Sequence, residues 1–293
     1  MSRTKEILKQ VKKVEIKTKH LVDGLLSGAY HSVFRGRGIE FSEVREYVAG
    51  DDVRSIDWNV TARMNHPYIK EFIEERDLTI YIVLDASASN EFGYEKSKKD
   101  SAIELAASLM FAALRNNDRV GLCLFTDKVE RYLPPRKGRQ NTLRLIREMI
   151  EYSPKSKTTD LASTLQFLSR VIKKRSVIFI ISDFFTGPFE KELRLMKKRH
   201  DVIAINLSDI RESEMPDVGC IELEDEETGE QVLVDTSDAK FRQQYSELVK
   251  QRNNELINKL KMLKVDNIQL KSAEPFEIPL KKFFRLRKRR MSR

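Results

Sequence analysis

The sequence predicts an α/β fold in which a mostly parallel, doubly wound sheet carries helices on both of its faces. Two observations support this prediction. Strand-length runs rich in Val, Ile and Leu recur between residues 79 and 271, and helix-length segments alternate with them. Parallel strands that are buried on both faces form near-continuous apolar runs, and alternating strands and helices are typical of a three-layer sheet.

The elements follow in a regular order after residue 79. The segment Thr79–Asp85 (TIYIVLD) is a β-branched run that begins the sheet, and Ser176–Ser182 (SVIFIIS) has the same character. The expected strands are 79–85, 119–126, 129–133, 176–182, 201–207 and 265–271, and the expected helices are 95–116, 138–152, 160–174, 189–199 and 237–263. A hairpin is expected near 219–235, where two short runs flank a Glu-Thr-Gly-Glu turn.

Residues 1–75 precede this pattern and are expected to pack on the main domain, 76–272. Apolar residues at helical spacing predict a helix over 4–26. The segment 36–75 is expected to be irregular and extended, with Trp58, the only tryptophan, as a core anchor. Its charged residues have two interpretations: a docking surface for a partner, or ion pairs and turn caps, and the second is favoured. They are Arg45, Asp51, Asp52, Arg54, Asp57 and Arg63.

Composition excludes several classes of protein. The chain has 293 residues, of which 40% are hydrophobic and 34% charged, so it is long enough for a substantial core. No apolar run approaches the roughly 20 residues of a membrane-spanning helix, and residues 1–20 lack the apolar core of a signal peptide. Two distant cysteines, Cys123 and Cys220, exclude a disulfide framework and a structural zinc site. A cytoplasmic protein is therefore expected.

The net charge of +9 is concentrated at the two ends of the chain. Residues 281–293 hold eight Lys or Arg and no acid, and residues 1–20 carry +5, which leaves −4 for residues 21–280. The segment 273–293 is expected to be a basic tail. It is either a surface for anionic lipid at the inner face of the membrane or a solvated tail, and Phe283 and Phe284 favour surface docking. Nucleic acid is the less favoured anionic ligand.

Polar side chains gather where the expected strands end. Asp85, Ser87 and Ser89 follow the first strand in the pattern D-x-S-x-S, Asp183 follows the strand 176–182, and Thr159 precedes a helix. The carboxyl ends of parallel strands meet at one edge of a doubly wound sheet, which is where ligands bind. Carboxylate and hydroxyl oxygens are the hard donors that Mg²⁺ takes. The alternative is a polar strand-end turn.

This order of residues resembles the metal-ion-dependent adhesion site (MIDAS) of von Willebrand factor A domains. The resemblance implies that Asp85, Ser87 and Ser89 are ligands from the first loop, Thr159 from the second and Asp183 from the third. It implies Mg²⁺, or Mn²⁺ or Ca²⁺, with a coordination position left for an acidic residue of a partner. One departure is that the Thr159 loop reads Lys155-Ser-Lys-Thr-Thr159, without the usual glycines.

A second resemblance covers roughly residue 20 to the end of the chain. The segments Gly36–Phe41, Arg45–Tyr47 and Gly50–Trp58, with the later Glu227–Glu230, are similar to the bacterial domain of unknown function 58 family. Members of that family place such a segment before a von Willebrand A-like domain. The resemblance implies a partnership with MoxR-type AAA+ ATPases.

We therefore expect a non-enzymatic, metal-dependent adaptor that works with a MoxR-type ATPase or its client in protein assembly or maturation. Two alternatives stay open. One is a Mg²⁺-dependent hydrolase or phosphatase using Asp85, although a haloacid-dehalogenase-type enzyme needs a second acid where Ser87 stands. The other is a nucleic-acid or anionic-membrane binder acting through the basic tail.

Overall fold

The computed structural model describes residues 3–21, 38–75, 78–87, 97–154, 156, 158–209, 215–224, 231–272 and 274–291. The chain divides into two compact units: the smaller is Phe34–Leu78, and the larger combines Met1–Val33 with Thr79–Arg293. Among the described residues, no helix combines the length and the apolar character that crossing a bilayer requires.

The larger unit contains a six-stranded sheet that confirms the predicted fold class. In spatial order its strands are β10 (Asp266–Lys271), β7 (Asp201–Ser208), β6 (Val177–Ser182), β3 (Thr79–Asp85), β4 (Arg119–Phe125) and β5 (Val129–Arg136). All neighbouring pairs are parallel except β4 and β5, so the antiparallel strand lies at one edge. The sheet is therefore mostly parallel and doubly wound, as predicted.

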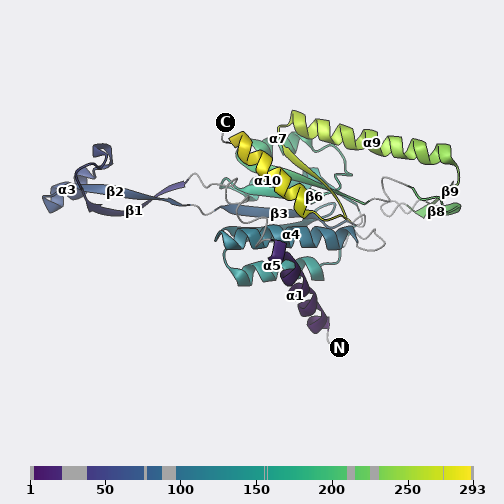
Figure 1. Cartoon of the computed structure of the whole chain (residues 1–293), viewed down its shortest axis with the longest axis horizontal. Helices are drawn as coiled ribbons and strands as arrows, with labels where there is room; N and C mark the ends of the chain where they lie inside the picture. The colour runs from purple at the N-terminus through teal and green to yellow at the C-terminus, as the bar shows by residue number, and fades with distance from the viewer. Residues whose placement is uncertain are drawn as a thin grey trace. The chain divides into compact units, whose positions relative to one another are not determined.

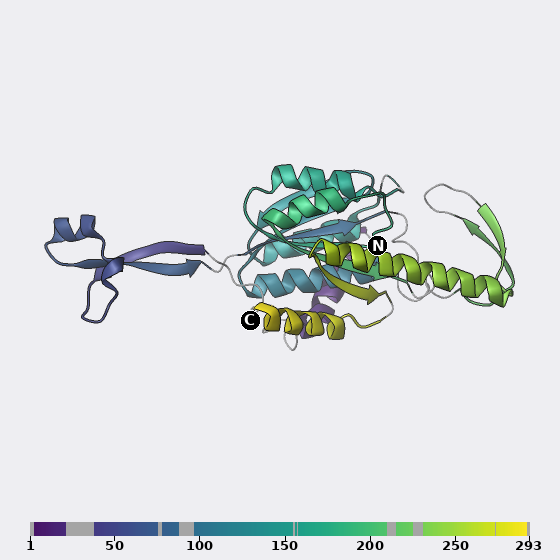
Figure 2. The same ribbon diagram turned by 90° about the horizontal axis from the view of Figure 1, so that it is seen from above.

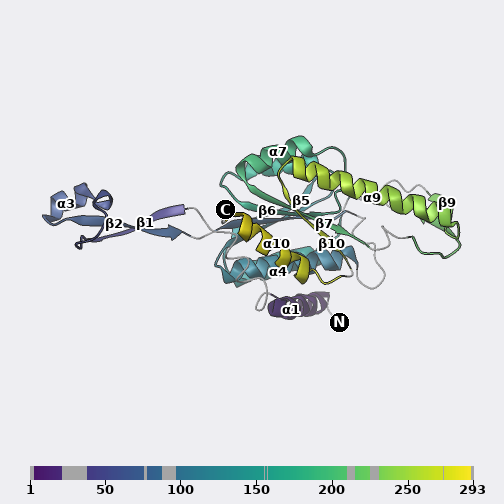
Figure 3. The same ribbon diagram turned by 45° about the horizontal axis from the view of Figure 1, so that its top comes forward.

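Helices cover both faces of the sheet (Figures 1 and 3). One layer contains α4 (Lys98–Arg115) and α5 (Arg139–Glu151), with α1 (Arg3–Leu21) packed against their outer side; the other contains α6 (Leu161–Val171), α7 (Glu190–Arg199) and α9 (Ala239–Met262). Alternate strand residues face each layer. Val83, Phe125 and Ile180, for example, share a core with Leu165 of α6 and Leu260 of α9. Burial on both faces explains why the strands β3 and β6 are apolar at nearly every position.

The strands β8 (Cys220–Glu224) and β9 (Gln231–Asp235) form an antiparallel pair at the predicted position. They adjoin the start of α9 (Figure 2). Val232 and Leu233 on β9 are exposed, so within the described residues this pair contributes little to the core.

Residues 277–291 form a helix, α10 (Glu277–Met291), where a basic tail was expected. Apolar residues at helical spacing give it a buried stripe against β10, and Phe283 and Phe284 belong to that stripe instead of being offered to a partner surface. Arg287, also buried, pairs with Asp266 at 2.8 Å and with Asp201. The outward face remains basic, so an anionic partner surface stays a prediction.

The smaller unit is an antiparallel hairpin, where an irregular segment was expected. β1 (Gly38–Glu46) pairs with β2 (Tyr68–Glu75), and a short 3₁₀ helix (Val53–Ser55) and α3 (Trp58–Met64) lie between them. An irregularity in the register between Phe41 and Glu43 breaks the alternation that would have revealed β1 in the sequence. The prediction that Trp58 anchors a core is wrong, since its side chain is 69% exposed.

Four of the six charged residues singled out in the smaller unit form ion pairs or caps within that unit. Arg45 bonds both carboxylate oxygens of Asp51, at 2.8 and 2.9 Å, and this pairing lowers the pKa of Asp51 to about 2. Asp52 caps the 3₁₀ helix, and Asp57 caps α3 and lies 3.4 Å from Lys70. These contacts agree with the favoured structural interpretation for Arg45 and the three acids. Arg54 and Arg63 are exposed, and the docking interpretation stays a prediction for them.

Gly121 on β4 gives a prediction about the sheet beside the candidate site. A Cβ added there would lie 2.9 Å from the carbonyl oxygen of Leu133 and 3.1 Å from the Tyr81 ring. Because the first of these neighbours is backbone, Gly121→Ala is expected to destabilise the fold by about 1–3 kcal/mol. Thermal unfolding monitored by circular dichroism measures this. An unchanged melting temperature would show that β5 adjusts freely.

Candidate functional site

The candidate site lies at the carboxyl ends of β3 and β6, which are neighbours in the sheet. The chain runs from β3 outward to β4 and β5, and later returns to the other side of β3 with β6. Such a reversal of strand order opens a crevice at the sheet edge. Asp85 is the last residue of β3, and Asp183 directly follows β6. The structure therefore brings together two of the predicted carboxylates from positions about a hundred residues apart.

Asp85 is held by hydrogen bonds on both carboxylate oxygens. The backbone N–H of Ser87 donates to Oδ1 at 3.0 Å, and the hydroxyl of Ser182 donates to Oδ2 at 2.7 Å. The Ser182 oxygen in turn accepts from the N–H of Phe184 at 3.0 Å. The side chain is therefore fixed in one orientation at the end of its strand.

The environment of Asp85 disfavours its ionised form. Burial, and secondarily the negative charge of Asp183, raise the pKa of Asp85 to about 6, against a usual value of 3.8. The hydrogen bonds from Ser182 and Ser87 act in the opposite direction and are outweighed. The charge of Asp183 therefore reaches Asp85, and the two carboxylates belong to one polar cluster.

Lys98 supplies positive charge to the same site. It is the first residue of α4, its side chain is fully buried, and its Nζ lies 2.9 Å from Oδ2 of Asp183. The other Asp183 oxygen, Oδ1, accepts from the N–H of Phe185 at 2.9 Å. Sequence analysis missed both Lys98 and Ser182. The available signal for Lys98 was a cation at the start of a helix, where the helix dipole disfavours it.

The other three predicted metal ligands, Ser87, Ser89 and Thr159, are described to different extents by the structure. Ser87 is fully buried beside Asp85, whereas Ser89 lies outside the described residues. The carbonyl of Thr159 accepts from the Thr186 hydroxyl at 2.9 Å, and the backbone N–H of Asp160 donates to the carbonyl of Thr126 at 2.9 Å. These bonds tie the Thr159 loop to the loops that follow β6 and β4, at the same sheet edge.

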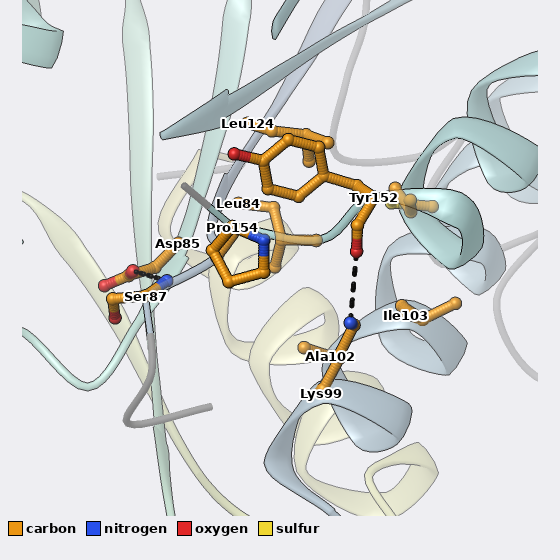
Figure 4. Close-up of a pocket in the computed structure, with 11 residues that line it drawn as sticks. Leu84, Asp85, Ser87, Lys99, Ala102, Ile103, Leu124, Tyr152 and Pro154 are labelled. Atoms are coloured by element: carbon orange, nitrogen blue, oxygen red, sulfur yellow. Dashed lines mark hydrogen bonds between the residues drawn. The ribbon is translucent and has the colours of Figure 1, made fainter. Parts of the chain in front are cut away.

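A small pocket of about 20 Å³ opens beside Asp85 (Figure 4). Asp85 and Ser87 lie at one end, and Lys99, which donates to the carbonyl of Tyr152 at 3.1 Å, lies at the other. The rest of the lining is apolar, apart from Tyr152. Among the described residues that line it, no histidine and no second carboxylate accompanies Asp85.

The oxygen donors fit a hard divalent cation. Asp85, Ser87 and Asp183 offer carboxylate and hydroxyl oxygens, the ligands that Mg²⁺ prefers, and Asp183 lies close enough to raise the pKa of Asp85. Among the described residues, those of the candidate site included, no group of three His, Cys, Asp or Glu side chains is arranged to hold a metal. The candidate site has two acids, and its other donors are hydroxyls.

Comparison with known proteins gives one family. The model of the family "Protein of unknown function DUF58" matches residues 43–255. The uncharacterized protein Rv1480 of Mycobacterium tuberculosis is 37% identical over 221 residues, which cover 74% of this chain and 69% of that protein.

Two solved structures also align with this chain. BatB from Bacteroides thetaiotaomicron has a TM-score of 0.48 at 14% identity, covering 72% of this chain and 99% of BatB. An aerotolerance-related membrane protein from Bacteroides fragilis has a TM-score of 0.49 at 15% identity, covering 73% of this chain and 100% of that protein. The match of the family model spans most of the chain, from within β1 to within α9, and so includes five of the six strands of the sheet. This chain therefore belongs to the DUF58 family.

Proposed function

We propose that this chain is a protein-interaction module that binds an acidic residue of a partner at the carboxyl ends of β3 and β6. The observation that carries the proposal is the position of Asp85. It is a buried carboxylate, 2% exposed, at the crevice where doubly wound sheets bind ligands, and its burial disfavours the ionised form. A buried carboxylate whose ionised form is disfavoured does not help to stabilise the fold at neutral pH. The presence of Asp85 at this crevice therefore favours a binding role.

Mg²⁺ is the proposed cofactor, with Mn²⁺ or Ca²⁺ as alternatives. Asp85, Ser87 and Asp183 would hold it, and the MIDAS resemblance adds Ser89 and Thr159. A bound divalent ion supplies an open coordination position for a carboxylate from outside. The chain's own contribution is to orient the donors: Ser182 fixes Asp85, and the N–H of Phe185 fixes Asp183.

The family resemblance supports a MoxR-type AAA+ ATPase, or its client, as the partner that provides the carboxylate. The exposed face next to the site suits a protein surface. Phe185 is 53% exposed immediately after Asp183, and the Arg252 guanidinium lies 3.7 Å from the centre of its ring. These two residues offer apolar contact and positive charge beside the carboxylates.

The hydrolase alternative is less well supported. A nucleophilic carboxylate needs an accessible oxygen, whereas both oxygens of Asp85 accept hydrogen bonds in a buried position. The described residues that line the pocket also offer no histidine as a general base, and Asp183, the other acid of the site, is paired with Lys98.

Partner capture tests the proposal. The full chain is immobilised and exposed to a purified MoxR-type ATPase from the same organism, with Mg²⁺ or with chelator. We expect binding only with the metal, and we expect Asp85→Ala and Asp183→Ala each to reduce it at least tenfold.

The control is Cys123→Ala, which changes a buried residue on the neighbouring strand β4 and should leave capture unchanged. Equal capture by wild type and Asp85→Ala would contradict the proposal. Turnover of phosphoesters by the purified chain that disappears in Asp85→Ala would replace it with the hydrolase.

A further inference from the structure

Lys98 is a fully buried lysine whose position is unusual. Its side chain has no exposed surface, and it stands at the first position of α4. Lysine is almost never fully buried unless it is paired, because taking an ammonium out of water is costly. A cation at a helix N-terminus is also opposed by the helix dipole. A specific partner must therefore hold it there.

That partner is a carboxylate of the candidate site. Lys98 Nζ lies 2.9 Å from Oδ2 of Asp183, whose side chain is only 12% exposed. Asp183 directly follows Ser182, which bonds Asp85. The ammonium thus lies within the same small polar cluster that would bind a divalent ion.

A divalent ion at these carboxylates and the Lys98 ammonium would repel each other strongly in a buried environment. Positive charges a few ångströms apart repel each other strongly even with the effective dielectric constant of about 20 that describes protein sites. The same Oδ2 atom of Asp183 also cannot serve both at full strength. The two cations are therefore alternatives.

We propose that Lys98 is an internal counter-ion that competes with the divalent metal for Asp183. In one state Lys98 neutralises the site; in the other the metal is bound and Lys98 has left Asp183. The inference rests on the metal part of the proposed function and adds its regulation: the chain holds its own site in a low-affinity state for metal. Movement at the start of α4 accompanies metal binding.

The experiment measures Mn²⁺ binding to the full chain by titration calorimetry and by the rise of melting temperature with metal concentration. Lys98→Met removes the charge and keeps most of the side-chain volume. We expect its Mn²⁺ affinity to rise roughly tenfold or more over wild type. Lys99→Met is the matched comparison, since Lys99 is the next residue, lies at the far end of the Asp85 pocket and bonds a backbone carbonyl; its affinity should rise far less than that of Lys98→Met.

The location of the gain is tested by adding Asp85→Ala to Lys98→Met, which should abolish it. Equal Mn²⁺ affinity in wild type and folded Lys98→Met overturns the inference, as does an equal gain in Lys99→Met. Lys98→Met leaves Asp183 without its hydrogen-bond donor beside Asp85. Lys98→Gln is therefore a second variant, which removes the charge and keeps a hydrogen-bond donor. Variants that fold only with Mn²⁺ support the inference, and variants that fold in neither condition overturn it.

The failure of this inference is separable from failure of the proposed function. Asp85-dependent partner capture together with an unchanged affinity in Lys98→Met would retain the interaction module and reject the counter-ion. A strong gain in Lys98→Met together with Asp85-independent capture would do the reverse.

Discussion

Phe284→Ala is expected to lower the free energy of unfolding by about 3–5 kcal/mol, the usual cost of emptying a buried aromatic position. Phe284 is fully buried, and its ring lies 5.4 Å from that of Phe283, edge to face. A domain is stable by only about 5–15 kcal/mol, so this loss is large. Urea unfolding monitored by far-UV circular dichroism measures it, because Trp58, the only tryptophan, reports on the smaller unit.

The matched control is Leu286→Ala on the same helix, since Leu286 is 43% exposed and should change stability by less than about 0.5 kcal/mol. A small effect of both substitutions would show that α10 is not docked in solution.

The buried side of α10 limits which variants can test the basic face of this helix. Removing residues after Leu280 would take Phe283, Phe284 and Arg287 out of the core along with the surface charges. A lost interaction after such a truncation would therefore report unfolding as readily as lost charge. Substitutions confined to exposed basic residues, such as Lys281 and Lys282, leave the buried stripe intact.

Asp85→Asn is expected to raise stability at neutral pH by about 2–3 kcal/mol, the free energy that corresponds to a shift of about two pKa units. The pKa of Asp85 is raised to about 6 in the folded chain, first by burial and then by Asp183, against 3.8 ordinarily. An acid with a raised pKa binds its proton more tightly when folded. Its contribution to stability is complete below about pH 4 and is lost as the pH rises through about 6.

The substitution removes this loss while the amide oxygen can still accept from the N–H of Ser87. The melting temperatures of the variant and wild type should therefore coincide near pH 4 and separate increasingly up to pH 7.5. A lower melting temperature for Asp85→Asn at pH 7.5 would contradict the prediction. It would mean that the ionised carboxylate of Asp85 stabilises the fold. Asp85 would then not be a binding residue that lowers stability.

Local pattern was enough to predict the sheet and part of the site. Burial on both faces makes β3 and β6 apolar throughout, so the strands were recognisable without tertiary information. The rule that carboxyl ends of parallel strands share an edge then placed Asp85 and Asp183 together. The helix α10 carried its own signal as well, an apolar stripe at helical spacing that the dense positive charge obscured.

Only the tertiary structure decided the role of Lys98. The chain contains 54 Lys and Arg residues, and neighbouring sequence does not distinguish Lys98 from Lys99. Their fates differ because α4 begins with Lys98 directed at Asp183, 85 positions away in the sequence, while Lys99 reaches the backbone at Tyr152. Charge pairing between distant segments depends on where the fold brings them. The sequence determined which strand ends carry the acids, and packing determined which cation meets them.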